Sequence, residues 1–353
     1  MRRVTQYFAR RIAAALLTVL VLIALSFVVV VAVPSDTAAF VYPNTFHLTA
    51  YQVKHGNHLL GVDRPLPARY FDYVEHLARG DFGHQWGGAK LVHNDHLIEA
   101  PIGPQLFSVT RETLSIILGG GLIVLLIAIP LGLTAGAKVG TWTDRLISLG
   151  ALVGICTHPR VLAGVLVKLV GPRQWIPTGG YCPLVKGHFD QCGGPVDWAS
   201  HLILPWVTFA LLFLALYVRI IRAGVDEALH EDYVRTARSK GATEPRVLTR
   251  HVLPSVGLNV LTMVGMEVST ALGVCIYIET SFDFNGLGRL ALFTMGGAEA
   301  SIDQPFTVAI VTMITLFVVV GNLVVDFLYS VLDPRAAVEP RRGRGKLAAG
   351  GII

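Results

Sequence analysis

Residues 12–33, IAAALLTVLVLIALSFVVVVAV, form an apolar run without a charged side chain. A helix of this length can cross the hydrocarbon core of a bilayer, which is about 30 Å thick. The run follows Arg2, Arg3, Arg10 and Arg11, as the core of a secretory signal would. Its apolar part is too long for a cleaved signal, however, and no convincing small-residue cleavage site follows it. We therefore predict an uncleaved first transmembrane helix.

Five further apolar runs along the chain have the length of a membrane span. They are residues 114–136, 146–170, 199–221, 255–277 and 306–329. Hydrophobic residues make up 53% of the chain and charged residues 15%, and the mean hydropathy is +0.58. Soluble domains carry about a quarter charged residues, so a soluble bundle of buried core helices is disfavoured. We predict an all-α integral membrane protein with six transmembrane helices.

Small residues at a spacing of four occur in two of the predicted spans. Gly132 with Gly136, and Gly150 with Gly154, have the spacing that lets helix backbones approach closely. The pattern is common, and it predicts helix packing and nothing more.

The basic residues lie beside the apolar runs rather than in one patch with interleaved aromatic residues. The net charge of +5 therefore indicates a membrane protein and not a nucleic-acid-binding protein. Because lysine and arginine accumulate in cytoplasmic segments, both termini are predicted to lie inside. The predicted organisation is a cytoplasmic N-terminus and first helix (1–33), an extracytoplasmic segment forming a small cap (34–105), a five-helix core (106–334) containing a cytoplasmic loop at 223–254, and a basic cytoplasmic tail (335–353).

The outer segments contain a predicted helix and a predicted disulfide. Tyr70, Val74 and Leu77 recur at helical spacing, which predicts a short amphipathic helix over 67–79. Cys182 and Cys192 share a Gly/Pro-rich outer loop, where a disulfide is permitted. We predict the bridge, with two free thiols as the alternative.

The outer segments are also rich in histidine. His93 and His96 could share a metal ion only if they lay on one turn, and no acidic or cysteine partner stands at tight ligand spacing. No metal site is predicted.

The cytoplasmic segment 227–254, EALHEDYVRTARSKGATEPRVLTRHVLP, is predicted to be a helix, a glycine break and a second helix. Its acidic residues come first and its basic residues second, in the order that suits a helix dipole. These residues are Glu227, Glu231 and Asp232, then Arg235, Arg238 and Lys240. Glu231 and Arg235 are expected to pair at i,i+4. Gly241 is predicted to end the first helix in a left-handed conformation, Thr243 to cap the second, and Pro245 to lie in its first turn.

An ordered helix pair of this kind suggests an element that docks in a groove on a partner. An amphipathic connector lying on the lipid surface is the alternative. The physical argument alone leaves the two open.

The spacing Ala237-x3-Gly241-x9-His251-x-Leu253-Pro254 resembles the coupling loop of permease subunits of binding-protein-dependent ABC importers. The sequence DYVRTARSKG…RHVLP is similar to that of the dipeptide and oligopeptide branch of the family. Arg235, Thr236 and Ala237 stand where the general family pattern has Glu-Ala-Ala. Further resemblance lies in FARRIAAALLTVLVLIALSFVVVVAVPSD (8–36), LLGVDRPLPARYFDYVEHLARGDFG (59–83), IPLGLTAGAKVGTWTDR (129–145), IETSFDFNGLGRLALFTM (278–295) and VVDFLYSVLDPR (324–335).

This resemblance implies a permease of the type I ABC importer kind that works in a complex. The implied partners are a second permease, two cytoplasmic ATPase subunits and an extracytoplasmic solute-binding protein. No G-x4-G-K-S/T loop occurs, so the chain is not expected to be an enzyme, and ATP and Mg would be bound by the ATPase subunits. The residues that it implies for coupling are Glu231, Asp232, Tyr233, Arg235, Thr236, Ala237, Lys240, Gly241, His251, Leu253 and Pro254.

Ionisable residues inside predicted spans are costly and usually face the bundle interior. Arg160 and Glu267 stand near the middle of the third and fifth spans, so they are candidates for a mutual ion pair or for lining the translocation path. A pair that only fixes packing, within the chain or with the second permease, is the favoured alternative. His158 and Asp326 are further ionisable residues within spans.

The predicted function is therefore an importer permease for di- or oligopeptides in a prokaryotic cell membrane. Nickel or another small solute handled by the same family is an alternative. A stand-alone channel or secondary transporter is another, but it would be expected to show an internal repeat or broken half-helices at matching positions. No nucleophile–base pair or metal-binding helix motif supports a membrane enzyme.

Overall fold

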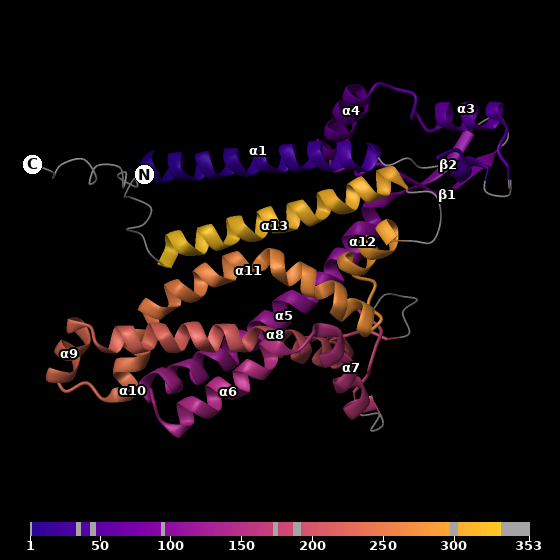
Figure 1. Cartoon of the computed structure of the whole chain (residues 1–353). Coiled ribbons are helices and arrows are strands. Elements are labelled where there is room, and N and C mark those ends of the chain that lie inside the picture. The colour runs from indigo at the N-terminus through magenta and orange to yellow at the C-terminus, as the bar shows by residue number, and fades with distance from the viewer. Residues whose placement is uncertain are drawn as a thin grey trace, which may run out of the picture.

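The computed structural model describes residues 2–32, 37–42, 47–92, 96–171, 176–185, 192–296 and 303–332. Within these residues, five helices are long and apolar enough to cross a membrane. They are α1 (Arg2–Ala32), α5 (Ile102–Ala137), α8 (Pro195–Leu229), α11 (Leu253–Ser281) and α13 (Gln304–Leu332). Neighbours pack in the order α1, α13, α11, α8, α5 (Figure 1). The predicted all-α membrane class is confirmed, with one small β-hairpin added.

The predicted third span is not one helix. It is divided into α6 (Trp142–Cys156) and α7 (Pro159–Val170), and each is too short to cross a bilayer alone. Pro159 lacks an N–H group and disfavours helical backbone at the residue before it. His158 is accordingly extended (φ −66°, ψ 135°), and its Nδ1 accepts the Arg160 N–H at 3.2 Å as the cap of α7. The prediction of a continuous helix over 146–170 is therefore wrong.

The close approach of α5 and α8 depends on the predicted small residues. A Cβ atom at Gly132 would lie 2.5 Å from Cγ2 of Ile221, and one at Gly136 would lie 2.6 Å from Cβ of Val225. Side chains on α8 therefore occupy the space above both glycines. By contrast, a Cβ at Gly150 would meet none of the described residues within 4 Å, so the packing prediction is confirmed for the first pair, and Gly150 makes no such close contact with the described part of the chain.

The main core lies between α5, α8 and α11. Fully buried side chains from these three helices meet there, among them Ile116, Leu202, Ile221 and Ile278. Leucines on α1, such as Leu16, Leu17 and Leu25, are instead largely exposed. An exposed apolar helix face suits contact with lipid tails.

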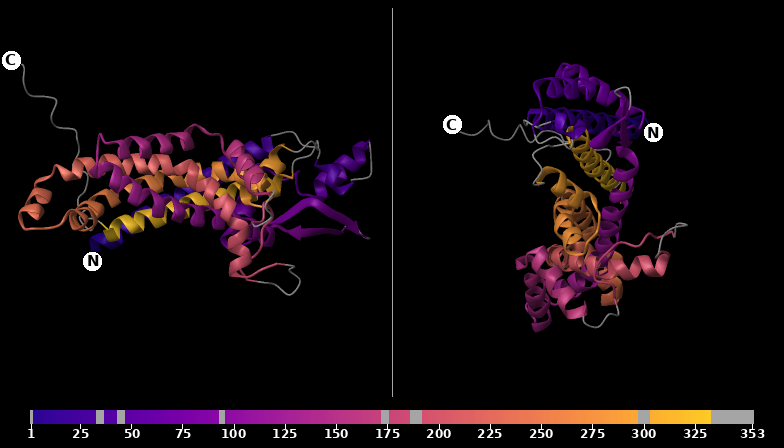
Figure 2. Two further views of the ribbon diagram at one scale, coloured as in Figure 1. Left: turned by 90° about the horizontal axis from the view of Figure 1, so that it is seen from below. Right: turned by 90° about the vertical axis from the view of Figure 1, so that its right-hand side faces the viewer.

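The segment before α5 forms a cap at one end of the bundle. It contains α2 (Ala38–Val41), α3 (Ala50–Leu59), α4 (Leu66–Ala78) and an antiparallel hairpin of β1 (His84–Val92) and β2 (His96–Pro101). Figure 2 shows this cap and the helices α9 and α10, described below, at opposite ends of an elongated molecule.

The helix α4 confirms the amphipathic helix predicted over 67–79. Its Tyr70 hydroxyl donates to the carbonyl of Leu20 at 3.2 Å, and its Tyr73 hydroxyl donates to Oγ1 of Thr312 at 2.9 Å. The Phe27 ring lies 5.9 Å from that of Tyr70. The aromatic face of α4 thus rests on α1 and α13.

The hairpin is held to the start of α13 by a buried carboxylate. Oδ2 of Asp303 accepts the Gly87 N–H at 2.6 Å, and Oδ1 accepts the Phe306 N–H at 3.1 Å. Burial raises the pKa of Asp303 above the usual range. The predicted tail (335–353) and His93 lie outside the described residues.

Candidate functional site

The loop after α8 begins with a turn that the sequence did not reveal. Helix α8 ends at Leu229, Glu231 is extended (φ −72°, ψ 147°), and α9 covers Asp232–Ser239. Glu227 therefore belongs to the last turn of α8, and the prediction that it shares a helix with Asp232 is wrong. Ala228 before the turn and Val234 after it are both buried in the main core. The turn lets both side chains reach that core.

The glycine break is confirmed. Gly241 has φ +81°, the left-handed region that only glycine adopts readily. Its N–H donates to the carbonyl of Arg238 at 2.9 Å, and the Ala242 N–H donates to the carbonyl of Ala237 at 3.2 Å. This pair of hydrogen bonds is the Schellman motif, which satisfies carbonyl groups at a helix end.

The second helix of the loop is short and continues into α11. Thr243 is extended at the N-terminus of α10 (Glu244–Val247), with Pro245 in the first turn as predicted. The Thr243 side chain makes no capping hydrogen bond, so its predicted capping role is wrong. A π-helical turn, η2 (Leu248–Val252), then joins α10 to α11 without a break.

Two ion pairs stabilise the loop. Arg235 Nη1 lies 3.6 Å from Oδ1 of Asp232, so the predicted partner Glu231 is wrong. Glu231 is the extended N-cap residue of α9 and lies outside the helix itself. Arg238 donates from Nε and Nη2 to the two carboxylate oxygens of Glu244, at 2.8 and 3.1 Å. This two-point contact ties α9 to α10 across the glycine break.

The loop has a buried face and an exposed face. Val234, Val247 and Val252 are buried in the main core, and Ala237 is also buried. Of the residues implied in coupling, Ala237 thus faces inward, and His251 and Leu253 are half-buried. The others are exposed: Glu231, Asp232, Tyr233, Arg235, Thr236, Lys240, Gly241 and Pro254. This polar face, held on a packed apolar one, is free to meet a partner.

Arg160 and Glu267 do not pair within the described part of the chain. Arg160 is exposed in the first turn of α7, because the helix break at Pro159 moves it out of the middle of a span. Glu267 is half-buried in α11, and its Oε2 atom is buried without a hydrogen-bond partner among the described residues. The predicted internal ion pair is wrong, and a path-lining role for either residue stays a prediction. The other ionisable residue, Asp326 of α13, pairs with Arg11 of α1.

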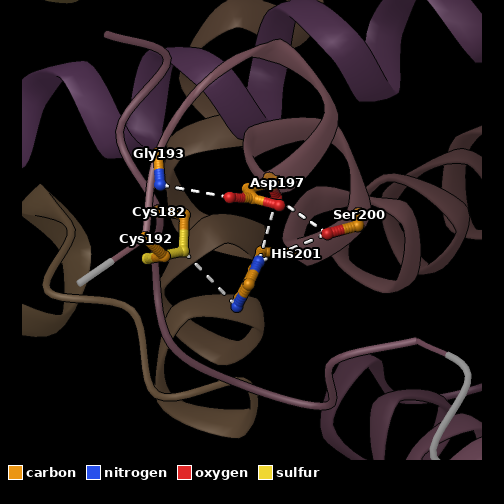
Figure 3. Close-up of a disulfide and its surroundings, with 6 residues drawn as sticks. All are labelled: Cys182, Cys192, Gly193, Asp197, Ser200 and His201. Atoms are coloured by element: carbon orange, nitrogen blue, oxygen red, sulfur yellow. Dashed lines mark hydrogen bonds between the residues drawn. A yellow bond between two sulfur atoms is a disulfide. The ribbon is translucent and has the colours of Figure 1, made fainter. Parts of the chain in front are cut away.

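The cysteines of the outer loop are joined in the structure. The Cys182 and Cys192 sulfur atoms form a disulfide, with Cα atoms 5.7 Å apart (Figure 3). Next to it, Cys182 Sγ lies 3.5 Å from Nε2 of His201 on α8. The Gly193 N–H donates to Oδ2 of Asp197, also on α8, at 3.3 Å. The bridged loop is thereby anchored on the first turns of α8.

A further ion pair links α6 to α8. Arg222 donates from Nη2 to Oδ2 of Asp144 at 2.8 Å, and its Nε contacts the other carboxylate oxygen. The Gly140 N–H also donates to Asp144. These contacts lower the pKa of Asp144 to about 2, with the Arg222 hydrogen bonds the largest cause. This pair was not predicted from the sequence, because its members are 78 residues apart in the chain.

A buried polar cluster joins α5, α11 and α12 (Leu287–Gly296). The Glu279 carboxylate is fully buried, and it accepts the Thr113 hydroxyl at 2.6 Å and the Arg289 N–H at 2.7 Å. Thr113 Oγ1 in turn accepts the Leu287 N–H at 2.8 Å. Side chains from α5 and α11 therefore cap the start of α12.

A cavity of about 480 Å³ opens beside this cluster. Its polar lining includes Gln105, Ser108, Glu112, Asn285 and Arg289. Oε2 of Glu112 accepts the Asn285 N–H at 2.9 Å. Nearby Asp283 has φ +56°, which is unusual for a residue other than glycine, and its carboxylate binds Nη1 of Arg289 at 2.5 Å. The cavity thus presents a carboxylate and a guanidinium, each held by the turn between α11 and α12.

Glu279 and Arg289 belong to the segment IETSFDFNGLGRLALFTM, whose resemblance to the family assigned neither residue a role. Glu112 was missed because it lies just before the predicted second span, whereas α5 begins ten residues earlier, at Ile102. A carboxylate next to an apolar run was the available signal for this residue.

Comparison with known sequences decides the family. The profile of the family described as "Binding-protein-dependent transport system inner membrane component" matches residues 128–338, more than half of the chain. The chain belongs to this family. The profile described as "Binding-prot-dependent transport system membrane comp, N-term" matches residues 4–90 of this permease, which include α1 and much of the cap.

Several curated relatives align with almost the whole permease. A glutathione transport system permease protein of Salmonella typhimurium is 28% identical over 330 residues, covering 93% of this chain and 97% of its own. An oligopeptide transport system permease protein of Bacillus subtilis is 29% identical over 276 residues, covering 78% and 82%. A Sinorhizobium fredii protein named "Probable peptide ABC transporter permease protein" is 29% identical over 305 residues, covering 86% and 90%. This permease is thus a transport subunit of the ABC importer type.

Proposed function

We propose that this permease forms half of the translocation path of an ATP-driven importer for di- or oligopeptides, and that its 227–254 loop couples to a separate ATPase. The observation that carries the coupling proposal is the two-faced geometry of α9. Its Val234 is packed into the core while Tyr233, Arg235 and Thr236 are exposed. A solvated connector would not need its turn fixed by a Schellman motif and a two-point ion pair.

The loop is built to transmit movement as a unit. The core that holds Val234 and Val247 continues through Val252 and Val256 into α11, and through Val225 and Ala228 into α8. A displacement of α9 by an ATPase would therefore move the adjoining ends of α8 and α11. Such rigid-body movement of spans about a path is a known means of gating.

The proposed assembly contains a second permease, two ATPase subunits that bind ATP and Mg, and an extracytoplasmic binding protein. Support for peptide as the solute comes from the relatives named for peptide, oligopeptide and glutathione transport. The proposed location is a prokaryotic cell membrane with both termini cytoplasmic. Arg11 of α1 pairs with Asp326 of α13, and the start of α1 and the end of α13 lie on the side of α9 and α10 in Figure 1.

The coupling proposal is tested with two loop variants and a matched control. Gly241→Asp adds a charged side chain to the exposed face, and Thr236→Pro breaks α9. Gly140 also has a left-handed conformation (φ +80°), and a Cβ there would meet none of the described residues within 4 Å, so Gly140→Asp imposes the same backbone strain outside the loop. We expect the two loop variants to abolish ATP-driven uptake and copurification of the ATPase, while Gly140→Asp retains both.

Normal uptake by properly inserted Gly241→Asp and Thr236→Pro proteins would exclude the docking role. The solute is tested separately, by purifying the assembled complex and extracting the ligand from its binding protein. Peptides in that extract support the proposed solute, whereas a nickel complex would contradict it. Recovery of the chain alone, with solute movement that needs no ATP, would replace the whole proposal with a stand-alone transporter.

A further inference from the structure

The cavity beside α12 has a place in the molecule that suits a solute. In Figure 1, α12 lies beside the first part of α5 on the side of the hairpin, and α9 and α10 lie at the far end. In the proposed orientation, the cavity therefore lies toward the outer end of the permease. A solute delivered from outside would reach this end first.

The charge of Glu112 is not explained by its structural contact. Glu112 is only 8% exposed, and among the described residues its carboxylate accepts one hydrogen bond, from the Asn285 N–H. A neutral glutamine could also accept that bond, and a buried carboxylate is costly unless a positive group compensates it. Glu279 and Thr113 already hold the turn and the start of α12. The Glu112 carboxyl group is thus available for a ligand.

Arg289 supplies the opposite charge. Its Nη1 atom donates to Asp283 and, at 3.3 Å, to the carbonyl of Phe284, and its guanidinium lies 5.5 Å from the centre of the Phe293 ring. These contacts orient the planar group, while Nε and Nη2 make no hydrogen bond to the described residues. A guanidinium held in this way is suited to bind a carboxylate with two parallel hydrogen bonds.

The remaining lining matches the middle of a short peptide. Gln105, Ser108 and Asn285 offer donors and acceptors for peptide groups, and Val109, Leu290 and Phe293 provide an apolar wall. The volume of about 480 Å³ is within the range of small-molecule sites. We propose that this cavity holds a zwitterionic di- or tripeptide, with Glu112 binding its α-ammonium group and Arg289 its α-carboxylate. The assignment rests on the proposed import of peptides and adds a site to it.

The test compares three probes in proteoliposomes containing the whole complex and its binding protein. The probes are trialanine, N-acetyl-trialanine and trialanine amide, and ATP-driven uptake of each is measured. Every variant is measured with the same binding protein. The preferences of the binding protein among the probes therefore cancel when the ratios of probe uptake are compared between variants. The variants are Glu112→Gln and Arg289→Gln. Arg111→Gln is the control, because Arg111 is the exposed neighbour of Glu112 and does not line the cavity.

We expect Glu112→Gln to reduce the preference for trialanine over its N-acetyl form by about tenfold, the effect of losing one hydrogen bond between charged groups. Its preference for trialanine over the amide should stay unchanged. Arg289→Gln should instead reduce the preference for trialanine over the amide and leave the preference over the N-acetyl form unchanged. Arg289→Lys should keep part of the preference over the amide, and Arg111→Gln should match the wild type in both ratios.

Three outcomes would overturn the site alone. One is that Glu112→Gln and Arg289→Gln reduce the uptake of all three probes equally, or do not reduce it at all. Another is that the wild type transports all three probes equally. The third is failure of Glu112→Gln and Arg289→Gln to copurify with the second permease when Arg111→Gln does, which would make the cavity a subunit contact. ATP-driven uptake of none of the probes by the wild type would instead refute the peptide proposal, and the site with it.

Discussion

Two glycines at the start of α12 allow side chains from α11 to occupy the space where a Cβ atom would be. A Cβ atom at Gly286 would lie 2.1 Å from Cδ of Glu279, and one at Gly288 would lie 2.7 Å from Cγ1 of Ile276. Even the smallest side chain would displace a carboxylate that caps α12. The reason for glycine here is therefore space, whereas at Gly241 it is backbone conformation.

Gly286→Ala should lower the stability of the purified permease by about 1–3 kcal/mol, the usual cost of overpacking. The Glu279 carboxylate would have to move and would lose its bonds to Thr113 and Arg289. Thermal unfolding of the complex in detergent measures the change. Gly257→Ala on α11 is the control, because a Cβ there meets nothing within 4 Å. A Gly286→Ala protein as stable as the control would show that the carboxylate has room to move.

Asp303 predicts a dependence of stability on pH. A carboxyl whose pKa is raised by folding contributes stability below its unfolded pKa of about 4, and that contribution is lost as pH rises through the folded pKa. The wild type should therefore lose stability from pH 4 to pH 7 relative to Asp303→Asn, whose amide is neutral throughout. Melting temperatures at both values measure the difference. Parallel profiles for the two proteins would contradict the assigned effect of burial.

At the scale of elements, the helix pair α9–α10 is held by contacts from both of its faces. The buried valines fix its position on α8 and α11, and Arg238 with Glu244 fixes the angle between its two helices. Exposed ion pairs contribute up to about 1 kcal/mol, so this pair matters for geometry more than for global stability.

Reversing either charge should reduce ATP-driven uptake several-fold without preventing insertion, because like charges would force α9 and α10 apart. The double variant Arg238→Glu/Glu244→Arg should recover most of the uptake. Uptake by the two single variants and the double variant, corrected for the amount in the membrane, provides the test. A double variant no better than the singles would indicate that these side chains contact the ATPase rather than each other.

At the scale of the whole molecule, the cap and the α9–α10 pair lie at opposite ends (Figure 2). Helix α1 runs along α13, and the ion pair between Arg11 and Asp326 joins the two helices near the end that carries α9 and α10. If the chain crosses the membrane along the length of the bundle, the two ends face different compartments.

Cysteine labelling tests this arrangement in a background with Cys156→Ala and Cys275→Ala. Tyr51 in the cap is 74% exposed, and Lys240 at the opposite end is also exposed. A membrane-impermeant maleimide should label Tyr51→Cys in intact cells and Lys240→Cys only after permeabilisation. The unsubstituted background reports any reaction of Cys182 and Cys192. The opposite labelling pattern would invert the proposed orientation.

The sequence by itself determined the features that depend on neighbouring residues. A long uncharged run is enough to predict α1, the spacing of Tyr70, Val74 and Leu77 predicts α4, and a glycine after a polar helix predicts the turn at Gly241. Pro159 was also a local signal for a helix break, but the apolar run around it outweighed that signal in the analysis. These features need no knowledge of distant contacts.

Only the tertiary structure decided which polar groups meet. Thr113 and Glu279 are 166 residues apart, and Glu112 and Asn285 are 173 apart, yet both pairs are joined by hydrogen bonds. The packing of α5, α11 and α12 brings the members of each pair together. No periodicity of charge along the chain predicts these contacts. Only the structure likewise showed that the helix break at Pro159 leaves Arg160 exposed and that Glu267 Oε2 has no hydrogen-bond partner among the described residues, so the pairing predicted from their positions in the chain was wrong.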